Sequence, residues 1–277
     1  MKIQNLCIIA GSGNLPLYAL TEALKRNQEK KMQIYVYVLD EDNKELLQSI
    51  EENKVAFRKI SLGKFDEVLK KLKADKVTHV LFIGKVQKKN ILKGIRFNLK
   101  TLMLLRKLKD WNDKSIFNLI AEELKKIKIE ILKQELFLQS LLCTPGLYSK
   151  QKPSKSELTD INYGMEFAKK IAWLDIGQTV IVANKTLLAV EAIEGTDEAI
   201  KRACMYAVKN TAVVCKAIRK GQDTRFDVPT VGLHTIETMR QNACRILAVE
   251  AGHTFVVNQE QFFKKINEYK MVFMALS

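Results

Sequence analysis

The chain has 277 residues, of which 47% are hydrophobic and 28% are charged. This length and composition exclude a disulfide-stapled miniprotein and a largely disordered chain, and they allow one large domain or two ordinary ones. The 46 Lys and Arg residues and 31 Asp and Glu residues give a formal net charge of +15. A positive field suits nucleic acid, a phospholipid surface or a phosphorylated substrate equally well.

The positive charge is concentrated in the first half of the chain. Residues 1–150 carry 29 basic and 17 acidic side chains, whereas residues 151–277 carry 17 and 14. The first half therefore faces an anionic partner or has a lysine-rich solvated surface, and the charge alone does not decide between the two.

The cysteines and the apolar runs indicate the compartment. The five cysteines are odd in number and none is part of a CxxC pair, which argues against a disulfide framework or a zinc ribbon and favours a reducing compartment. The first apolar run starts at Ile3 and ends at the glycine turn that begins at Gly11, and no other run approaches the length of a membrane span. We expect a cytoplasmic protein whose membrane contact, if it has any, is peripheral.

Strand-like and helix-like segments alternate in the first half. The expected strands are 3–10, 33–39 and 77–84, and the expected helices are 15–27, 65–72, 97–108 and 115–127. Such alternation is typical of βαβ units, so it predicts an α/β fold with a mainly parallel sheet that is covered by helices.

A segment rich in Pro, Gly, Ser and Lys, with the sequence CTPGLYSKQKPSKSE, follows this half. It predicts a linker over 143–157 between an N-terminal domain, 1–142, and a C-terminal domain, 158–277. In the second half the expected helices are 158–172, 197–209 and 235–242, and the expected strands are 179–183, 187–193, 211–215 and 228–232, followed by a strand, a helix and a strand after Arg245.

The first strand runs into a glycine turn, Gly11 to Pro16, with the sequence GSGNLP. Glycines between a strand and a helix let backbone N–H groups approach a phosphate, and Pro16 suits the start of a helix. A dinucleotide fingerprint would need a third glycine where Pro16 stands, so a dehydrogenase fits poorly. The turn indicates either an anion site or a simple tight turn.

The segment from Lys85 to Lys109 is basic and amphipathic. It has no acidic residue, and apolar side chains alternate with its lysines and arginines. Such a segment can rest on an anionic leaflet or hold phosphates. The alternative is a core helix with a solvated lysine face. Nucleic-acid binding is less favoured, because no nucleic-acid-binding motif accompanies the charge.

Carboxylates are the informative residues of the second half. Glu191 lies in an apolar, strand-like run, where an ionised group needs a cation or a metal as its partner. Glu194 and Asp197 flank a Gly-Thr turn that opens a helix, and the simpler explanation is helix capping by Thr196 with acids in the first turn.

A second polar run contains Asp223, Arg225 and Asp227. If this run is extended, the three side chains share one face, as in a site where carboxylates hold Mg²⁺ and an arginine binds phosphate oxygens. An internal ladder of salt bridges is the alternative. The three histidines lack metal-ligand spacing, so we interpret them as structural; they are His79, His234 and His253.

Several of these segments together resemble one known family. LDIGQT at 174–179, AVEAIEGTD at 189–197 and QDTRFDVPTVG at 222–232 are similar, in order and spacing, to the LpxI family of UDP-2,3-diacylglucosamine pyrophosphatases. IAGSGNLP at 9–16 and IGKV at 83–86 resemble the N-terminal motifs of that family, although Ser12 replaces a glycine. The resemblance spans nearly the whole chain, and we expect Ser12 to present its N–H to substrate in spite of this difference.

The resemblance implies an N-terminal Rossmann-like domain, a C-terminal α/β domain of family-specific fold, and an enzyme of lipid A synthesis on the cytoplasmic face of the inner membrane. The implied reaction is hydrolysis of UDP-2,3-diacylglucosamine to UMP and 2,3-diacylglucosamine 1-phosphate, with a divalent cation such as Mg²⁺ as cofactor. We expect the diphosphate and the acyl chains to bind between the two domains. Whether the protein is a homodimer is left open.

The family's essential acid falls on Asp227. The candidate catalytic residues are Asp227, Asp223, Arg225 and Lys216, and the candidate metal ligands are Asp227, Asp223, Glu194 and Asp197. The candidate substrate-binding residues are Gly11, Ser12, Gly13, Asn14, Leu15, Gly84, Lys85, Asp175, Gly177, Gln178, Thr179, Glu191, Gly195 and Thr196. The alternatives are a nucleic-acid-binding module that uses the basic half and a nucleotide-cofactor oxidoreductase that uses the glycine turn. Neither needs the acids of the second half.

Overall fold

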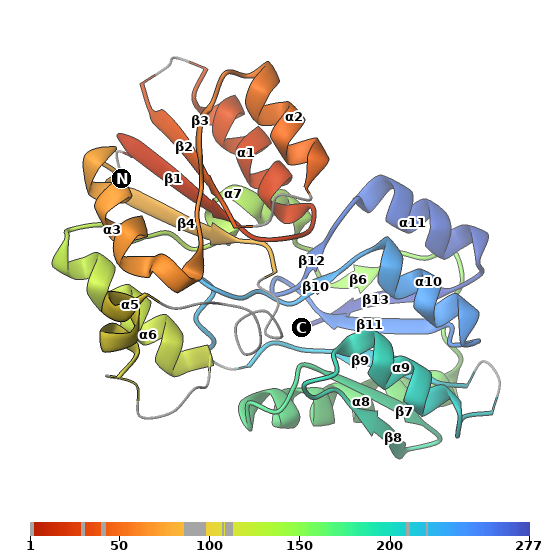
Figure 1. Ribbon diagram of the computed structural model, residues 1–277. Helices are drawn as coiled ribbons and strands as arrows, with labels where there is room; N and C mark the ends of the chain where they lie inside the picture. The colour runs from red at the N-terminus through yellow and green to blue at the C-terminus, as the bar shows by residue number, and fades with distance from the viewer. Residues whose placement is uncertain are drawn as a thin grey trace. The chain divides into compact units, whose positions relative to one another are not determined.

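The computed structural model of the chain describes residues 3–28, 31–39, 43–85, 98–106, 108, 113–208, 211–219 and 221–277. The chain forms two compact α/β units (Figure 1). The N-terminal unit comprises Met1–Leu138 and Thr224–Asp227, and the C-terminal unit comprises Gln139–Asp223 and Val228–Ser277. Four residues from the second half of the sequence therefore belong to the N-terminal unit.

The N-terminal unit contains a fully parallel five-stranded sheet in the order β3-β2-β1-β4-β5. Its strands are β1 (Asn5–Ala10), β2 (Gln33–Val38), β3 (Ala56–Lys59), β4 (His79–Ile83) and β5 (Glu130–Ile131). Its helices are α1 (Leu15–Arg26), α2 (Lys44–Glu52), α3 (Phe65–Ala74), α5 (Leu99–Leu105), α6 (Asp113–Lys126) and α7 (Glu135–Leu138), with a 3₁₀ turn η1 (Leu62–Lys64). This strand order is that of a Rossmann-like sheet, so the predicted fold class is confirmed.

Burial on both faces explains why the central strands of this sheet are continuous apolar runs. Cys7 and Ile9 of β1 pack in one cluster with Phe65 of α3 and Leu124 of α6. Helices α1 and α2 lie on the other side of the sheet (Figure 1). A parallel strand with helices on both faces needs apolar side chains in both directions, which is the pattern of residues 5–10.

The C-terminal unit contains a mixed six-stranded sheet in the order β6-β13-β11-β9-β7-β8. Its strands are β6 (Gly146–Leu147), β7 (Thr179–Ala183), β8 (Thr186–Val190), β9 (Val213–Lys216), β11 (Ile246–Glu250) and β13 (Val272–Leu276), and β10 (Thr230–Val231) and β12 (Phe255–Val256) form a separate pair. Strands β9, β11 and β13 are parallel, whereas β6, β7 and β8 pair antiparallel with their neighbours. The carboxyl ends of the parallel strands therefore meet at one edge.

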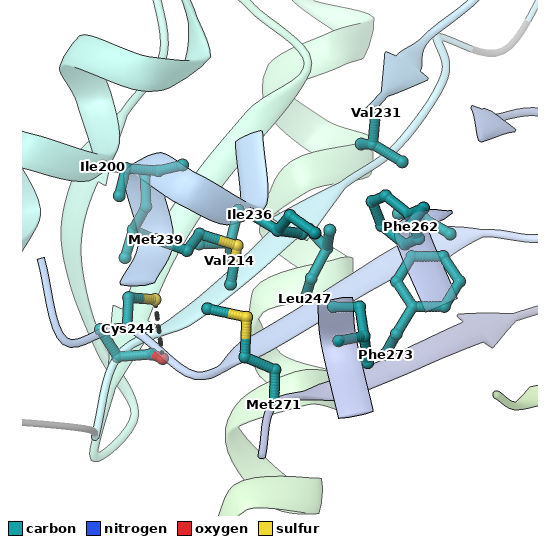
Figure 2. Packing of buried hydrophobic residues seen from close by; sticks show 14 of the residues in the cluster. Ile200, Val214, Val231, Ile236, Met239, Cys244, Leu247, Phe262, Met271 and Phe273 are labelled. Carbon is teal, nitrogen blue, oxygen red and sulfur yellow. Dashed lines mark hydrogen bonds between the residues drawn. The ribbon is translucent and has the colours of Figure 1, made fainter. Parts of the chain in front are cut away.

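Helices cover both faces of this second sheet. They are α8 (Lys155–Trp173), α9 (Thr196–Cys204), α10 (Leu233–Gln241) and α11 (Gln259–Glu268), with a 3₁₀ turn η2 (Gln139–Leu141). Helix α8 packs Ile161 and Ala168 against one face. On the other face, Ile200 of α9, Met239 of α10 and Phe262 of α11 cluster with strand residues, as Figure 2 shows.

Among the predicted boundaries that the structure corrects, two lie next to the polar residues of this unit. The strand expected over 187–193 ends at Val190, so Glu191 follows the strand instead of lying inside it. The helix expected over 197–209 spans Thr196–Cys204. Gly195, with a φ of 88°, is the N-cap in place of the predicted Thr196, because this positive φ is a backbone conformation that glycine adopts without strain.

Candidate active site

The glycine turn and the segment after β4 lie side by side at the carboxyl edge of the N-terminal sheet. The N–H of Gly11 donates to the carbonyl of Ile83, at 2.8 Å. Ser12 and Lys85 exchange two backbone hydrogen bonds, of 2.8 and 2.9 Å, and the Ser12 hydroxyl also donates to the Lys85 carbonyl. The structure thus brings together two predicted substrate-binding segments. It also corrects one expectation, because Lys85 already takes the N–H that Ser12 was to present to substrate.

Close backbone approach explains the glycines at two of these positions. A Cβ on Gly11 would lie 2.5 Å from the Lys85 carbonyl oxygen, and a Cβ on Gly84 would lie 2.8 Å from the Ser12 carbonyl oxygen. Gly13 has open space around it but a φ of +88°, which again favours glycine. The turn is therefore held by the backbone itself.

Helix α1 begins directly after this turn. Asn14 is its N-cap but makes no side-chain capping hydrogen bond, and Leu15 is its first residue. The carbonyl of Gly13 accepts a hydrogen bond from the side-chain amide of Asn43, at 2.8 Å. The sequence of the turn, GSGNLP, contains no carboxylate. Its role as an anion site stays a prediction.

The segment with Arg225 and Asp227 does not have the extended backbone that would place Asp223, Arg225 and Asp227 on one face. Residues 224–226 form a turn, so the extended run on which the predicted shared face depended is absent. The ring of Phe226 is buried in the apolar cluster of the N-terminal unit, which requires the chain to turn there. Asp227 is exposed at the end of the turn, and Asp223 lies in the C-terminal unit.

The C-terminal unit has a compact cluster of polar side chains, which we call the lysine cluster: Thr179, Glu191, Thr196 and Lys216. Lys216 ends β9, and its side chain is only 8% exposed. Its Nζ donates to the hydroxyls of Thr196 and Thr179, at 3.0 and 3.3 Å. A buried ammonium is unfavourable without such partners.

Glu191 provides the negative charge of the lysine cluster. Its Oε2 lies 3.8 Å from Lys216 Nζ, and its Oε1 accepts a 2.8 Å hydrogen bond from the Thr196 hydroxyl. The sequence predicted that Glu191 needs a cation or a metal, and the structure provides the cation Lys216. The position of Glu191 depends on Gly177, since a Cβ there would lie 2.0 Å from the Glu191 carbonyl oxygen.

Glu194 and Asp197, on either side of Gly195, have different partners. Arg202 binds Glu194 at 2.6 Å, and hydrogen bonds from backbone amides, together with the Arg202 guanidinium, lower the pKa of Glu194. Asp197 Oδ2 lies 3.2 Å from Nε2 of His234. From the sequence, His234 was interpreted as structural, and its pairing with Asp197 was not predicted, because no spacing rule links the start of α9 to the start of α10.

Asp175 and Gln178 lie before β7. Asp175 forms an ion pair with Arg219 at 3.0 Å, and the carbonyl of Gln178 accepts a hydrogen bond from the N–H of Ala217. Both contacts connect the start of β7 with the residues that follow β9. Because Lys216 directly precedes Ala217, the segment with Asp175 and Gln178 borders the lysine cluster.

The predicted carboxylates meet the needs of a divalent cation only in part. Within the described ranges, no three His, Cys, Asp or Glu side chains are close enough together to hold a metal ion. Mg²⁺, however, is usually bound by one or two carboxylates together with substrate phosphates and water. Asp197 fits this role, because its Oδ1 is buried and has no hydrogen-bond partner among the described residues. Glu194, which Arg202 occupies, fits it less well.

Comparison with known proteins identifies the family. The model of the LpxI N-terminal domain matches residues 5–141, and the model of the LpxI C-terminal domain matches residues 144–274. The chain belongs to the LpxI family. The UDP-2,3-diacylglucosamine pyrophosphatase LpxI of Caulobacter vibrioides is 28% identical to it over 214 residues, which are 73% of this chain and 75% of that protein.

The two LpxI domain matches differ from the two structural units in one respect. Residues 224–227 fall within the match to the LpxI C-terminal domain, yet in the structure they belong to the N-terminal unit. In this LpxI protein, Asp227 is therefore carried by the same unit as the glycine turn. The lysine cluster belongs to the other unit.

Proposed function

We propose that this LpxI protein hydrolyses UDP-2,3-diacylglucosamine to UMP and 2,3-diacylglucosamine 1-phosphate, as a step of lipid A synthesis. The observation that carries the proposal is the family match, which covers both domains and includes every candidate site residue. The name of the Caulobacter vibrioides relative supports the same substrate. The expected class of enzyme, a hydrolase, is confirmed by the family. The match favours a lipid-nucleotide over nucleic acid as the anionic partner.

Lys216 is the group best suited to act on the diphosphate from the C-terminal unit. Its ammonium is oriented by two threonine hydroxyls and by Glu191. A cation held in place before the reaction stabilises the charge that develops on the phosphate oxygens without having to reorganise. Arg225 is the second candidate for this role. We assign neutralisation of the diphosphate to Lys216 and Arg225.

Asp227 is the candidate acid of the N-terminal unit. It is exposed and directly follows the buried ring of Phe226, so the position of its backbone is fixed. We propose that Asp227, assisted by Asp223, acts at the reacting phosphate. The expectation that the substrate binds between the two domains stays a prediction.

A divalent cation is part of this proposal. Within the C-terminal unit, Asp197 is the carboxylate that we expect to hold it, together with phosphate oxygens of the substrate, and Asp227 remains a candidate ligand from the sequence. When bound, such an ion supplies neutralisation of the diphosphate and a water of lowered pKa. The contribution of this chain is to hold the carboxylates in place, as His234 does for Asp197 Oδ2.

We also propose peripheral contact with the cytoplasmic face of the inner membrane. No helix in the described part of the chain is long and apolar enough to cross a membrane. Residues 86–97, 107 and 109 of the basic segment lie outside the described residues. Helix α5, within that segment, exposes 74% of Leu99 and 59% of Met103. Exposed apolar side chains among lysines suit an anionic leaflet.

Liposome flotation tests this membrane contact. Flotation with anionic but not neutral liposomes is the expected result, and equal flotation with both would contradict it.

Release of UMP tests the proposed reaction. Purified protein should release UMP from UDP-2,3-diacylglucosamine when Mg²⁺ is present. EDTA should abolish the release, and excess Mg²⁺ should restore it. Full activity in EDTA would overturn the role of the cation, and UDP-glucose, which lacks the acyl chains, serves as the control for substrate specificity.

A further inference from the structure

The segment Thr224–Asp227 has contacts that place it in the N-terminal unit, although the chain on both sides of it belongs to the C-terminal unit. Phe226 is the buried residue of this segment, with only 9% of its surface exposed. It belongs to the cluster that contains Cys7, Ile9 and Leu124. Its ring thus occupies a core to which the neighbouring sequence does not belong.

Two aromatic rings hold Phe226. The ring of Phe117, on α6, stacks on it with a centroid distance of 4.4 Å and an interplanar angle of 7°. The ring of Phe82, on β4, lies 5.2 Å away and is tilted by 36°. Contacts at these distances favour specific ring orientations beyond the burial of apolar surface. The two partners therefore fix where the Phe226 ring lies and how it is oriented.

A backbone contact holds the same segment. The N–H of Gln134 donates to the carbonyl of Thr224, at 3.1 Å. Gln134 is buried, and its side-chain amide donates to the carbonyl of Phe82, at 3.0 Å. Gln134 thus connects the segment to the strand that also provides an aromatic partner for Phe226. Ring packing and hydrogen bonding together form an anchor.

The anchor lies near the carboxyl edge of the N-terminal sheet. Phe82 precedes the last residue of β4 and is two residues before Gly84, whose segment pairs with the glycine turn. Asp227 directly follows the anchored ring and is exposed. The anchor therefore holds an exposed carboxylate at the same edge of the sheet as the glycine turn.

We propose that Phe226 is a positioning residue for Asp227: its ring, held by Phe82 and Phe117, fixes the acid to the N-terminal unit. This inference rests on the proposed function, because it assumes that Asp227 acts on the substrate. A misplacement of a reacting group by about 1 Å can lower a rate about 100-fold. Loss of the ring should therefore reduce turnover much more than it reduces substrate binding.

Steady-state kinetics of Phe226→Ala and Phe226→Leu provide the first test. We expect kcat of Phe226→Ala to fall by about 100-fold with KM nearly unchanged, and Phe226→Leu to recover much of the loss because it refills the core. The matched control is Phe262→Leu, which changes a buried phenylalanine of the C-terminal unit and should lower the melting temperature but leave kcat unchanged. A wild-type kcat in folded Phe226→Ala would overturn the proposal.

A double variant separates positioning from general destabilisation. If Phe226 acts through Asp227, then Phe226→Ala should have almost no further effect on the residual turnover of Asp227→Asn. An equal reduction in both backgrounds would overturn the proposal.

Hydrogen exchange tests the anchor without any assay of activity. In Phe226→Ala, the peptide with Gln134 should exchange faster than in the wild type, while peptides of β1 stay protected. Unchanged exchange at Gln134 would show that the ring does not hold the segment. If the wild-type protein shows this anchor but releases no UMP, the proposed function fails and the anchor remains.

Discussion

The polar edges of the two units are built in different ways. In the N-terminal unit, the backbone forms the edge: Gly11 pairs with Ile83, and Ser12 pairs with Lys85, through amides and carbonyls. In the C-terminal unit, side chains form it, with Lys216 buried among threonine hydroxyls and a glutamate. The stability of the first edge should therefore depend little on charge, but it should fall when a Cβ is added where two backbone segments approach closely. The second should be sensitive to any change of charge.

The origin of the acids also differs between the edges. The N-terminal edge has Asp227, which reaches that unit from the second half of the sequence through the Phe226 anchor. The C-terminal edge has Glu191 and Asp197 on adjacent segments of its own unit. An exposed acid at a backbone edge should be replaceable without disturbing the fold. An acid that neutralises a buried lysine cannot change without a cost in stability.

Asp227→Asn should have the largest effect of the substitutions in this comparison. We expect turnover to fall between about 100-fold and 10,000-fold, as for loss of a group that acts at the reacting atoms, while the melting temperature stays close to that of the wild type. Steady-state release of UMP and a thermal melt measure the two quantities. Asp223→Asn is the matched control and should lose less activity. A large loss of stability in Asp227→Asn would contradict the distinction between the two edges.

Lys216→Met should show the opposite pattern. It leaves Glu191, whose side chain is 14% exposed, without its cation, and breaking one side of a buried pair typically costs about 3–5 kcal/mol. Urea denaturation measures the free energy of unfolding. The double variant Lys216→Met/Glu191→Gln should recover part of the loss. Lys201→Met, which removes an exposed ion pair from α9, should hardly change stability. Equal effects of Lys216→Met and Lys201→Met would refute the role of burial.

Gly84→Ala and Gly13→Ala distinguish close approach from backbone conformation at the N-terminal edge. Both positions have positive φ, and an alanine there costs about 1–2 kcal/mol. Gly84→Ala should cost more, because its Cβ would meet the Ser12 carbonyl oxygen, whereas Gly13 has open space. Denaturant unfolding of both variants measures the difference. Equal losses would show that the edge is not tightly packed.

Apart from the control Lys201→Met, Asp75→Asn should have the smallest effect, and it tests a charge of the N-terminal unit outside that edge. Arg58 and the hydroxyl of Tyr37 donate hydrogen bonds to Asp75, and the Arg58 guanidinium is the main cause of the lowered pKa of Asp75. Because Arg58 is 44% exposed, we expect a loss of only about 1 kcal/mol.

The pH dependence of that loss has a definite sign. A carboxyl whose pKa is lower in the folded state contributes stability above its unfolded pKa of about 4 and loses it as the pH falls through the folded value. The gap in unfolding free energy between wild type and Asp75→Asn should therefore be full at neutral pH and shrink below a pH of about 4. A gap that widens in acid would contradict the role of Arg58.

The sequence predicted what depends on local pattern. The alternation of strands and helices and the glycine turn at Gly11 are local, and the N-terminal sheet confirms them. That Glu191 needs a partner also follows from its apolar surroundings. The identity of that partner, Lys216, does not follow from the local sequence, because β8 and β9 are brought near each other only by pairing with β7.

The sequence did not predict features that depend on contacts between distant segments of the chain. The extended form that would place Asp223, Arg225 and Asp227 on one face is absent, because the ring of Phe226 packs on Phe82 and Phe117, far away in the chain. The pair of His234 and Asp197 joins two helices for the same reason. Neither contact leaves a periodic pattern in the sequence.

Phosphorus NMR of the reaction tests the proposed hydrolysis most directly. Purified protein with UDP-2,3-diacylglucosamine and Mg²⁺ should convert the diphosphate signals into those of UMP and 2,3-diacylglucosamine 1-phosphate in equal amounts, and Asp227→Asn should leave the diphosphate intact over the same time. Persistence of the diphosphate with the wild-type protein, or equal conversion by Asp227→Asn, would contradict the proposal.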